Sequence, residues 1–196
     1  MLSDFAIIAF TGKAGAGKTT AATYVANSLS SKNKRAKKAA FADPLKKLCC
    51  DVYSVAFGVP KTAFYGSQDA KNRELVSLPG WSGRKILQHI GTEGFRHVSP
   101  GVWANYAINY AQLSLNMDNY DHVILDDLRF ISEADAVRKA GGIVVGIQGG
   151  HANQGGAAQG IPGHVSETET ALVVPDRILI NDGTLEEFHT KLEKRL

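Results

Sequence analysis

The sequence predicts a three-layer α/β domain with a mostly parallel five-stranded sheet, on two observations. Short apolar runs rich in β-branched residues are typical of strands buried on both faces of a parallel sheet. These runs span residues 5–10, 122–125, 143–147 and 178–180, with a weaker fifth run at 39–41. The segments between them carry apolar residues at helical spacing, so strands and helices alternate along the chain.

Six segments have the spacing of amphipathic helices. They are residues 18–30, 44–57, 82–98, 102–117, 132–140 and 184–195. Two other segments break the pattern. Residues 58–81 mix glycine and proline with polar residues and predict an excursion over the sheet. Residues 148–163 hold six glycines and little apolar bulk, which predicts either a functional lid or a disordered loop.

Composition excludes several classes of protein. The 196 residues are 44% hydrophobic and 21% charged, which excludes disorder over the whole length. The net charge of +3 suits an anionic ligand but is too small to predict a nucleic-acid partner. The adjacent Cys49 and Cys50 predict no disulfide and a reducing, cytoplasmic setting. The N-terminal apolar run is too short for a signal core or a membrane span, so we expect a soluble protein without a membrane partner.

A glycine-rich stretch directly after the first apolar run satisfies the Walker A pattern. It reads Gly12-Lys13-Ala14-Gly15-Ala16-Gly17-Lys18-Thr19 and opens the first predicted helix. Glycines let the backbone wrap around a phosphate, Lys18 reaches the terminal phosphates and the Thr19 hydroxyl is placed to bind Mg²⁺. A glycine turn that only resembles the motif is the alternative, but the strand before and the helix after it favour a nucleoside triphosphate site. Lys13 is either a further phosphate contact or a solvated lysine.

A second group of charges stands at the end of the run 122–125. It reads Asp126-Asp127-Leu128-Arg129. Ligands of parallel sheets bind beyond the carboxyl ends of the strands, so these side chains are expected to point into the active-site crevice. One carboxylate could hold Mg²⁺ through water, and the guanidinium could grip a phosphate. The alternative is that one aspartate caps the next helix and pairs with Arg129.

Weaker candidates each have a plain structural alternative. Arg84, Gln88 and Thr92 fall roughly on one helical face, which suits a nucleoside monophosphate but also a solvated face. Trp103 could stack on a base, although core packing is commoner. The basic run 32–38 predicts a solvated helix end, and His164, Ser166 and Glu167 carry little weight as an acid–base set.

Taken together, several stretches resemble the bacteriophage-type deoxynucleoside monophosphate kinases, which belong to the wider nucleoside monophosphate kinase group of P-loop NTPase folds. Besides the phosphate loop, they are the Phe-Ala-Asp-Pro-Leu-Lys stretch at 41–46, the Arg-x-Ile-Leu-Gln-x-Ile-Gly-Thr-Glu stretch at 84–93, Val102-Trp103, the Asp-Asp-Leu-Arg-Phe-x-x-Glu stretch at 126–133, His164-x-Ser166-Glu167 and the Ile-Asn-Asp-Gly-Thr-Leu-Glu-Glu stretch at 180–187. They occur in the family's order and span nearly the whole chain.

The resemblance implies transfer of the γ-phosphoryl group of ATP to a deoxynucleoside monophosphate, with Mg²⁺. It implies one domain over 1–196, with a helical substrate-binding insertion at about 43–117, a lid at about 148–166 and a viral source acting in the host cytoplasm. ATP would be held by 12–19, Thr20, Asn181 and Gly183, and the metal by Thr19 and Asp127. The monophosphate would be bound by Asp43, Lys46, Arg84, Gln88, Gly91, Thr92, Trp103, Asp127, Arg129 and Glu133. Lys18, Arg84, Asp127 and Arg129 would be catalytic. Relatives are often dimers, so a homodimer is the assembly to test.

The sequence departs from the wider group at one point. Lids of many monophosphate kinases carry arginines, whereas residues 148–163 contain none. We therefore expect Lys13, Arg84 and Arg129 to neutralise the transferred phosphoryl group, with His151 and His164 as the nearest cations in or beside the lid. The rival functions are another small-molecule kinase, such as a dephospho-coenzyme A kinase, a P-loop ATPase or switch without an acceptor, and a nucleic-acid packaging ATPase.

Overall fold

A computed structural model describes residues 1–150 and 165–196. The chain divides into two compact units. The first comprises Met1–Phe41 and Ala104–Leu196, and the second comprises Ala42–Trp103. The second unit corresponds to the predicted insertion but ends earlier than residue 117, because α6 (Val102–Asn116) lies almost wholly in the first unit.

A parallel sheet of five strands forms the centre of the first unit. The strands are β1 (Ile7–Thr11), β2 (Ala36–Ala39), β5 (His122–Leu128), β6 (Ile143–Gly149) and β7 (Arg177–Asn181), in the order β2-β5-β1-β6-β7. Every neighbouring pair among them is parallel. The predicted fold class is confirmed. Since parallel strands share one carboxyl edge, the ends of β1, β5, β6 and β7 meet there.

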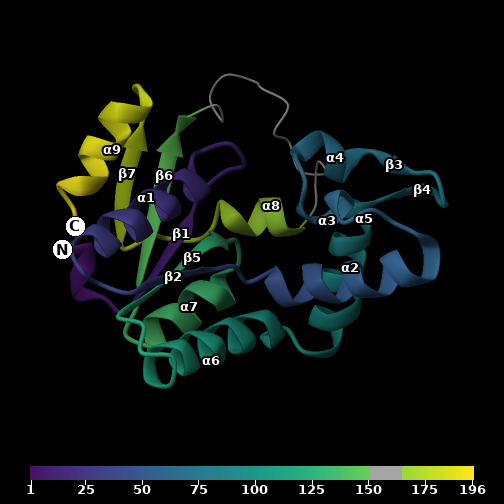
Figure 1. Ribbon diagram of the computed structural model, residues 1–196, viewed down its shortest axis with the longest axis horizontal. Helices are drawn as coiled ribbons and strands as arrows, with labels where there is room; N and C mark the ends of the chain where they lie inside the picture. The colour runs from purple at the N-terminus through teal and green to yellow at the C-terminus, as the bar shows by residue number, and fades with distance from the viewer. Residues whose placement is uncertain (151–164) are drawn as a thin grey trace. The chain divides into compact units, whose positions relative to one another are not determined.

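Helices cover both faces of this sheet, which gives the three predicted layers (Figure 1). Ile8 and Phe10 of β1 pack into one core with α1 (Lys18–Ser31) and α9 (Leu185–Glu193). Ile7 and Ala9 point the other way, into a core with α6 and α7 (Ile131–Lys139). The 3-10 helix η1 (Leu2–Asp4) and α8 (Val165–Thr170) complete the unit. Both faces of β1 are buried, as its continuous apolar run predicted.

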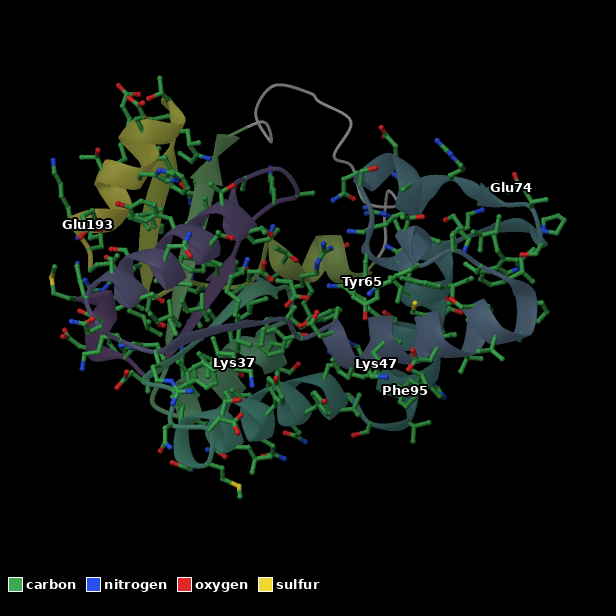
Figure 2. All side chains as sticks on the ribbon, in the orientation of Figure 1. Lys37, Lys47, Tyr65, Glu74, Phe95 and Glu193 are labelled. Carbon is green, nitrogen blue, oxygen red and sulfur yellow. The ribbon has the colours of Figure 1, made fainter. Side chains whose placement is uncertain are left out.

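The β2 strand corrects two predictions. It lies at Ala36–Ala39 rather than at 39–41, and it contains Lys37 and Lys38, which were predicted to end a helix. The side chain of Lys37 is labelled in Figure 2. Its ammonium lies over the rings of Tyr110 and Tyr120, at 4.6 and 5.1 Å from their centres. Aromatic rings accept both the alkyl stem and the charge of a lysine. These rings are distant in sequence, so a local pattern could not reveal them.

The second unit is built mainly from helices. They are α2 (Asp43–Phe57), α3 (Thr62–Tyr65), α4 (Gln68–Asn72), α5 (Gly83–Gln88) and the π-helix η2 (His89–Arg96). Strands β3 (Glu74–Leu75) and β4 (Leu78–Ser82) form an antiparallel hairpin. Residues 58–81, predicted as an irregular excursion, therefore form elements of their own. A separate core includes Leu45, Phe64 and Ile86.

The predicted lid at 148–166 falls mainly outside the described residues. Its first two positions belong to β6, which continues to Gly149, and α8 begins at Val165. His151, His164 and the side chains of Ser166 and Glu167 lie outside the described residues, and their roles stay predictions. Within the described chain, every helix is too short or too polar to span a membrane.

Candidate active site

The phosphate loop joins β1 to α1, and its glycines are required by its shape. Gly12, Gly15 and Gly17 have φ angles of 142°, 78° and 103°, in the region that L-residues with a Cβ rarely adopt. A Cβ on Gly12 would stand 2.4 Å from the carbonyl oxygen of Ile147 on β6. The backbone therefore takes a wrapped conformation that only glycine permits at these positions, with Gly17 as the N-cap of α1.

Lys18 lies folded over this loop. Its Nζ donates hydrogen bonds to the carbonyl oxygens of Gly12 at 2.6 Å and Lys13 at 2.9 Å. These bonds hold the ammonium at the loop, where it can exchange a carbonyl for a phosphate oxygen. Thr19 and Thr20 follow in the first turn of α1 and are exposed, as is Lys13. The predicted ATP-side residues 12–20 are thus assembled at one helix N-terminus.

Asp126 and Asp127 occupy an irregularity at the end of β5. Ala9 of β1 pairs with Leu125 and Thr11 pairs with Leu128, so both aspartates lie opposite one residue, Phe10. This is a β-bulge, a device that re-aims side chains and is common beside active sites. It places two half-buried carboxyl groups at the strand end next to the phosphate loop. They lie near the end of this strand, as expected, and their pointing into an active-site crevice stays a prediction.

Asp127 is also tied to the neighbouring strand segment. Its Oδ1 accepts a hydrogen bond from the backbone N–H of Phe41 at 2.7 Å. Neither aspartate caps the following helix, because the N-cap of α7 is Phe130. The capping alternative for these aspartates is therefore wrong, and the carboxylate that serves the helix start is Glu133.

Glu133 has a different role from the predicted one. Its carboxylate is 2% exposed, and Oε2 accepts the backbone N–H groups of Arg129 at 2.9 Å and Phe130 at 3.2 Å. The hydroxyl of Thr170 donates to the carbonyl oxygen of Arg129 at 3.1 Å. Arg129 therefore starts from a backbone fixed on both sides. Glu133 fixes the backbone of Arg129, and its burial argues against the predicted contact with substrate.

The end of β7 meets the phosphate loop through Asn181. Its Nδ2 donates to the carbonyl oxygen of Ala16 at 2.9 Å. Next to it, Lys191 of α9 donates to the carbonyl oxygen of Ile180 at 3.1 Å and pairs with Asp182. The hydrogen bond from Lys191 lowers the pKa of Asp182. Asn181 thus lies beside the loop that was predicted to bind ATP. That Gly183 lies near the adenine of ATP stays a prediction.

Sequence reasoning missed two glycines at the end of β6. A Cβ on Gly149 would lie 2.3 Å from the carbonyl oxygen of Asn181, and one on Gly150 would lie 2.8 Å from that of Gly15. Both have positive φ angles, 99° and 63°. They were counted with the lid because of their composition. The signal that could have separated them is their place directly after a strand, at the ligand-binding edge.

The predicted acceptor-side residues of the second unit lie on α2, α5 and η2. Arg84 donates from Nη2 to Oε1 of Gln68, and Lys46 pairs with Asp43 at 3.5 Å. The Oε1 atom of Gln88 is buried without a hydrogen-bond partner among the described residues. The helix changes from α to π at His89, so the predicted common face does not continue in α-helical register to Thr92. Such π segments are rare in proteins, and those that occur are often found at functional sites.

Trp103 and Gly91 belong to the core of the second unit. Trp103 is 7% exposed, and its Nε1 donates to the carbonyl oxygen of Gly91 at 3.1 Å. Its ring packs against Phe95 with centres 5.0 Å apart. A Cβ on Gly91 would approach Leu45 Cδ2 to 2.5 Å. The packing alternative therefore holds for Trp103, and the burial of both residues argues against the predicted direct contact with substrate.

Comparison with known proteins supplies the family. The sequence profile described as Deoxynucleotide monophosphate kinase matches residues 58–192, more than half of the chain. The chain belongs to this family. The resemblance stated from the sequence is therefore confirmed. The matched region of the deoxynucleotide monophosphate kinase profile includes Arg84, the two aspartates and Asn181, while the phosphate loop precedes it.

Relatives of this deoxynucleotide monophosphate kinase family member occur in viruses. A protein of Acanthamoeba polyphaga mimivirus, provisionally named a deoxynucleotide monophosphate kinase, is 32% identical over 195 residues, which cover 95% of this chain and 93% of its own. The deoxynucleotide monophosphate kinases of Escherichia phage RB69 and Enterobacteria phage T4 are 27% and 29% identical over 118 residues, 59% of this chain but 45% and 46% of theirs. Shikimate kinase of Acinetobacter baumannii aligns with 99% of this chain and 94% of its own, at a TM-score of 0.49 and 13% identity, too slight a likeness to decide the fold.

Proposed function

We propose that this protein transfers the γ-phosphoryl group of ATP to the 5′-phosphate of a deoxynucleoside monophosphate. An oxygen of the acceptor phosphate forms a bond to the γ-phosphorus, the bond to the β-phosphate oxygen breaks, and ADP leaves beside the deoxynucleoside diphosphate. The observation that carries the proposal is a glycine-shaped phosphate loop, with Lys18 held on it, in a chain of the deoxynucleotide monophosphate kinase family. The same match favours this acceptor over dephospho-coenzyme A.

On the donor side, residues 12–20 are proposed to bind the phosphates of ATP. Backbone N–H groups of the loop and the N-terminus of α1 face an anion favourably, and Lys18 adds a full charge. Oxygen ligands suit Mg²⁺, and the hydroxyl of Thr19 with the carboxylate of Asp127 would hold it. When bound, the ion supplies charge neutralisation on the phosphates.

On the acceptor side, the proposal assigns cations to the monophosphate. Phosphoryl transfer needs positioning and neutralisation of charge more than acid–base chemistry. Arg129 has a backbone fixed by Glu133 and Thr170, which suits a side chain that must hold a phosphate in one orientation. Arg84, Lys46 and Gln88 are the proposed ligands from the second unit. Lys13, Arg84 and Arg129 are proposed to replace the lid arginines that residues 148–163 lack.

The test of this function is an assay of ADP release with ATP and Mg²⁺. Each deoxyribonucleoside and ribonucleoside monophosphate is supplied in turn, beside a control without acceptor. Turnover that depends on a deoxy acceptor supports the proposal and gives the base preference. ADP release at one rate with every acceptor and with none would identify an ATPase or switch. Light scattering on the same sample tests the proposed homodimer, and fractionation of infected cells tests the host cytoplasm.

The role of Arg129 separates binding from catalysis. If Arg129 interacts more strongly with the transferred phosphoryl group in the transition state than in the ground state, Arg129→Ala lowers kcat by about 100-fold. Arg177→Ala is the control, since Arg177 is exposed at the amino end of β7, the end opposite Asn181. An unchanged kcat with a raised KM for the monophosphate would make Arg129 a ground-state ligand and would remove the main support for a fixed replacement of the lid arginines.

A further inference from the structure

The side-chain amide of Asn181 is packed against the phosphate loop. Asn181 is the last residue of β7 and pairs in register with Gly149 of β6. Its Nδ2 donates to the carbonyl oxygen of Ala16 at 2.9 Å. The contact joins residues that are 165 positions apart in the chain. It is a tertiary contact between the C-terminal strand and the loop that the family resemblance assigns to ATP.

Three glycines from two segments leave room for this amide. A Cβ on Gly17 would lie 2.7 Å from Nδ2 of Asn181, and one on Gly150 would lie 3.0 Å from the same atom. A Cβ on Gly149 would lie 2.3 Å from the backbone oxygen of Asn181. Real Cβ atoms essentially never approach a neighbouring atom to less than 3.0 Å. The phosphate loop and the end of β6 are therefore shaped around Asn181.

Asn181 is itself held by α9. Lys191 donates to the carbonyl oxygen of Ile180 and pairs with Asp182, so the residues on both sides of Asn181 are fixed. Thr184 caps α9 by accepting the backbone N–H of Glu187 at 3.2 Å. From the same helix, the buried ring of Phe188 would lie 3.6 Å from a Cβ on Gly17. A side chain held in this way can transmit the position of α9 to the loop.

The geometry of the peptide group gives the contact a consequence for phosphate binding. A trans peptide is planar, so its C=O and N–H point in opposite directions. The carbonyl of Ala16 is turned towards Asn181, and the N–H of Gly17, in the same peptide, must therefore point away from Asn181. Backbone N–H groups at this position of a phosphate loop are the groups that bind phosphate oxygens.

We infer that Asn181 is a positioning residue for phosphate binding, which fixes the Ala16–Gly17 peptide in the orientation that ATP needs. The inference rests on the proposed function in taking ATP as the ligand of the loop. It differs from the adenine contact expected from the sequence, because the hydrogen bond that Asn181 donates goes to the carbonyl oxygen of Ala16 in the loop. Recognition of the triphosphate then depends on Asn181, and recognition of the base does not.

The test compares two ligands that share phosphates but not a base. Asn181→Leu keeps the approximate size and removes the donor. Calorimetry measures the dissociation constants of ATP and of inorganic tripolyphosphate, both with Mg²⁺. Loss of one hydrogen bond that organises the loop is expected to weaken both ligands by the same factor, roughly five- to tenfold. The ratio of ATP to GTP affinity stays as in the parent. Weakening of ATP alone, or no weakening, would overturn the inference.

Two further variants keep the result interpretable. Asn181→Ala removes the donor together with volume and is expected to weaken both ligands by the same factor, so it decides the question if Asn181→Leu does not fold. Asn109→Leu on the exposed side of α6 is the control and should change neither constant. A parent protein that binds both ligands but phosphorylates no monophosphate would refute the proposed acceptor and leave this inference standing. A parent that binds neither refutes both.

Discussion

The phosphate loop and the candidate acceptor residues are built in different ways. The loop is defined by backbone: glycines with positive φ angles, carbonyl oxygens that hold Lys18, and tertiary contacts with Ile147 and Asn181. The acceptor candidates of the second unit are side chains on helices, in pairs such as Arg84 with Gln68 and Lys46 with Asp43. Backbone geometry tolerates almost no substitution, whereas a side chain on a helix can be exchanged without changing the fold.

This difference implies a division of labour. The triphosphate group of the donor is the same in every reaction, so a rigid binding loop made of backbone suits it. The acceptor differs in its base, and a helical unit with its own core can vary its side chains while the sheet stays the same. We therefore expect substitutions in the loop to abolish the reaction for every acceptor, and substitutions in the second unit to alter the choice among acceptors.

The largest effect is expected for Lys18→Met. The variant keeps the length of the side chain and removes the charge that meets the transferred phosphate, so kcat should fall by about 100- to 1,000-fold with every acceptor. ADP release is the measurement, with Lys34→Met at an exposed site as the control. A Lys18→Met enzyme with parental kcat would show that the loop does not serve the reaction.

A backbone effect comes next, for Gly12→Ala. The added Cβ meets the carbonyl oxygen of Ile147 at a φ of 142°, so the loop must move. Strain of about 1–3 kcal/mol corresponds to roughly 5- to 150-fold weaker ATP binding. Calorimetry with ATP measures it. Gly94→Ala is matched, because nothing lies within 4 Å of its Cβ, and it should bind ATP normally. Equal affinities in the two variants would contradict a backbone-defined cradle.

A smaller and selective effect is expected for Arg84→Ala. Loss of a charge-assisted hydrogen bond to the monophosphate should lower kcat/KM for the monophosphate by about tenfold or somewhat more, while the dissociation constant of ATP is unchanged. Arg73→Ala, an exposed arginine of the same unit, is the control. If Arg84→Ala weakened ATP instead, the separation between donor and acceptor residues would fail.

The smallest effect concerns stability of the second unit at high pH. Burial raises the pKa of the Cys49 thiol from 9.0 to about 11, since the thiolate is disfavoured in the core. The folded state therefore holds this proton more tightly than the unfolded chain, and its contribution is complete below pH 9 and is lost as the pH rises towards 11. In urea titrations, the parent should lose up to about 2 kcal/mol more than Cys49→Ala across this range. Equal losses of unfolding free energy in the parent and in Cys49→Ala would show that the Cys49 thiol makes no such contribution.

The parts of the fold that the sequence revealed are those with local causes. Continuous apolar runs marked the sheet because β1, β5 and β6 are buried on both faces. The phosphate loop was readable because its glycines stand in a fixed local order. The cap role of Glu133 was missed, although the third residue of a helix is the usual place for a capping carboxylate.

The parts that the sequence concealed depend on distant partners. Lys37 could not be assigned to a strand without the rings of Tyr110 and Tyr120. The contact between Asn181 and Ala16 joins opposite ends of the chain. The change from α- to π-helix at His89 was not predicted from the sequence, which favoured one continuous helix over 82–98. Long-range contacts therefore set both the strand edges and the details of the site.

The bulge at Asp126 and Asp127 has a consequence for changes in chain length. Val123, Leu125 and Leu128 enter the same core, so the extra residue also restores the alternation of β5 beyond it. A chain that lost one of the two aspartates by deletion would pair Leu128 with Thr11 as before and keep its core. At this point, losing a single codon would remove one acid and leave the pairing of β5 beyond it intact, so the charge of the site would change before the sheet did.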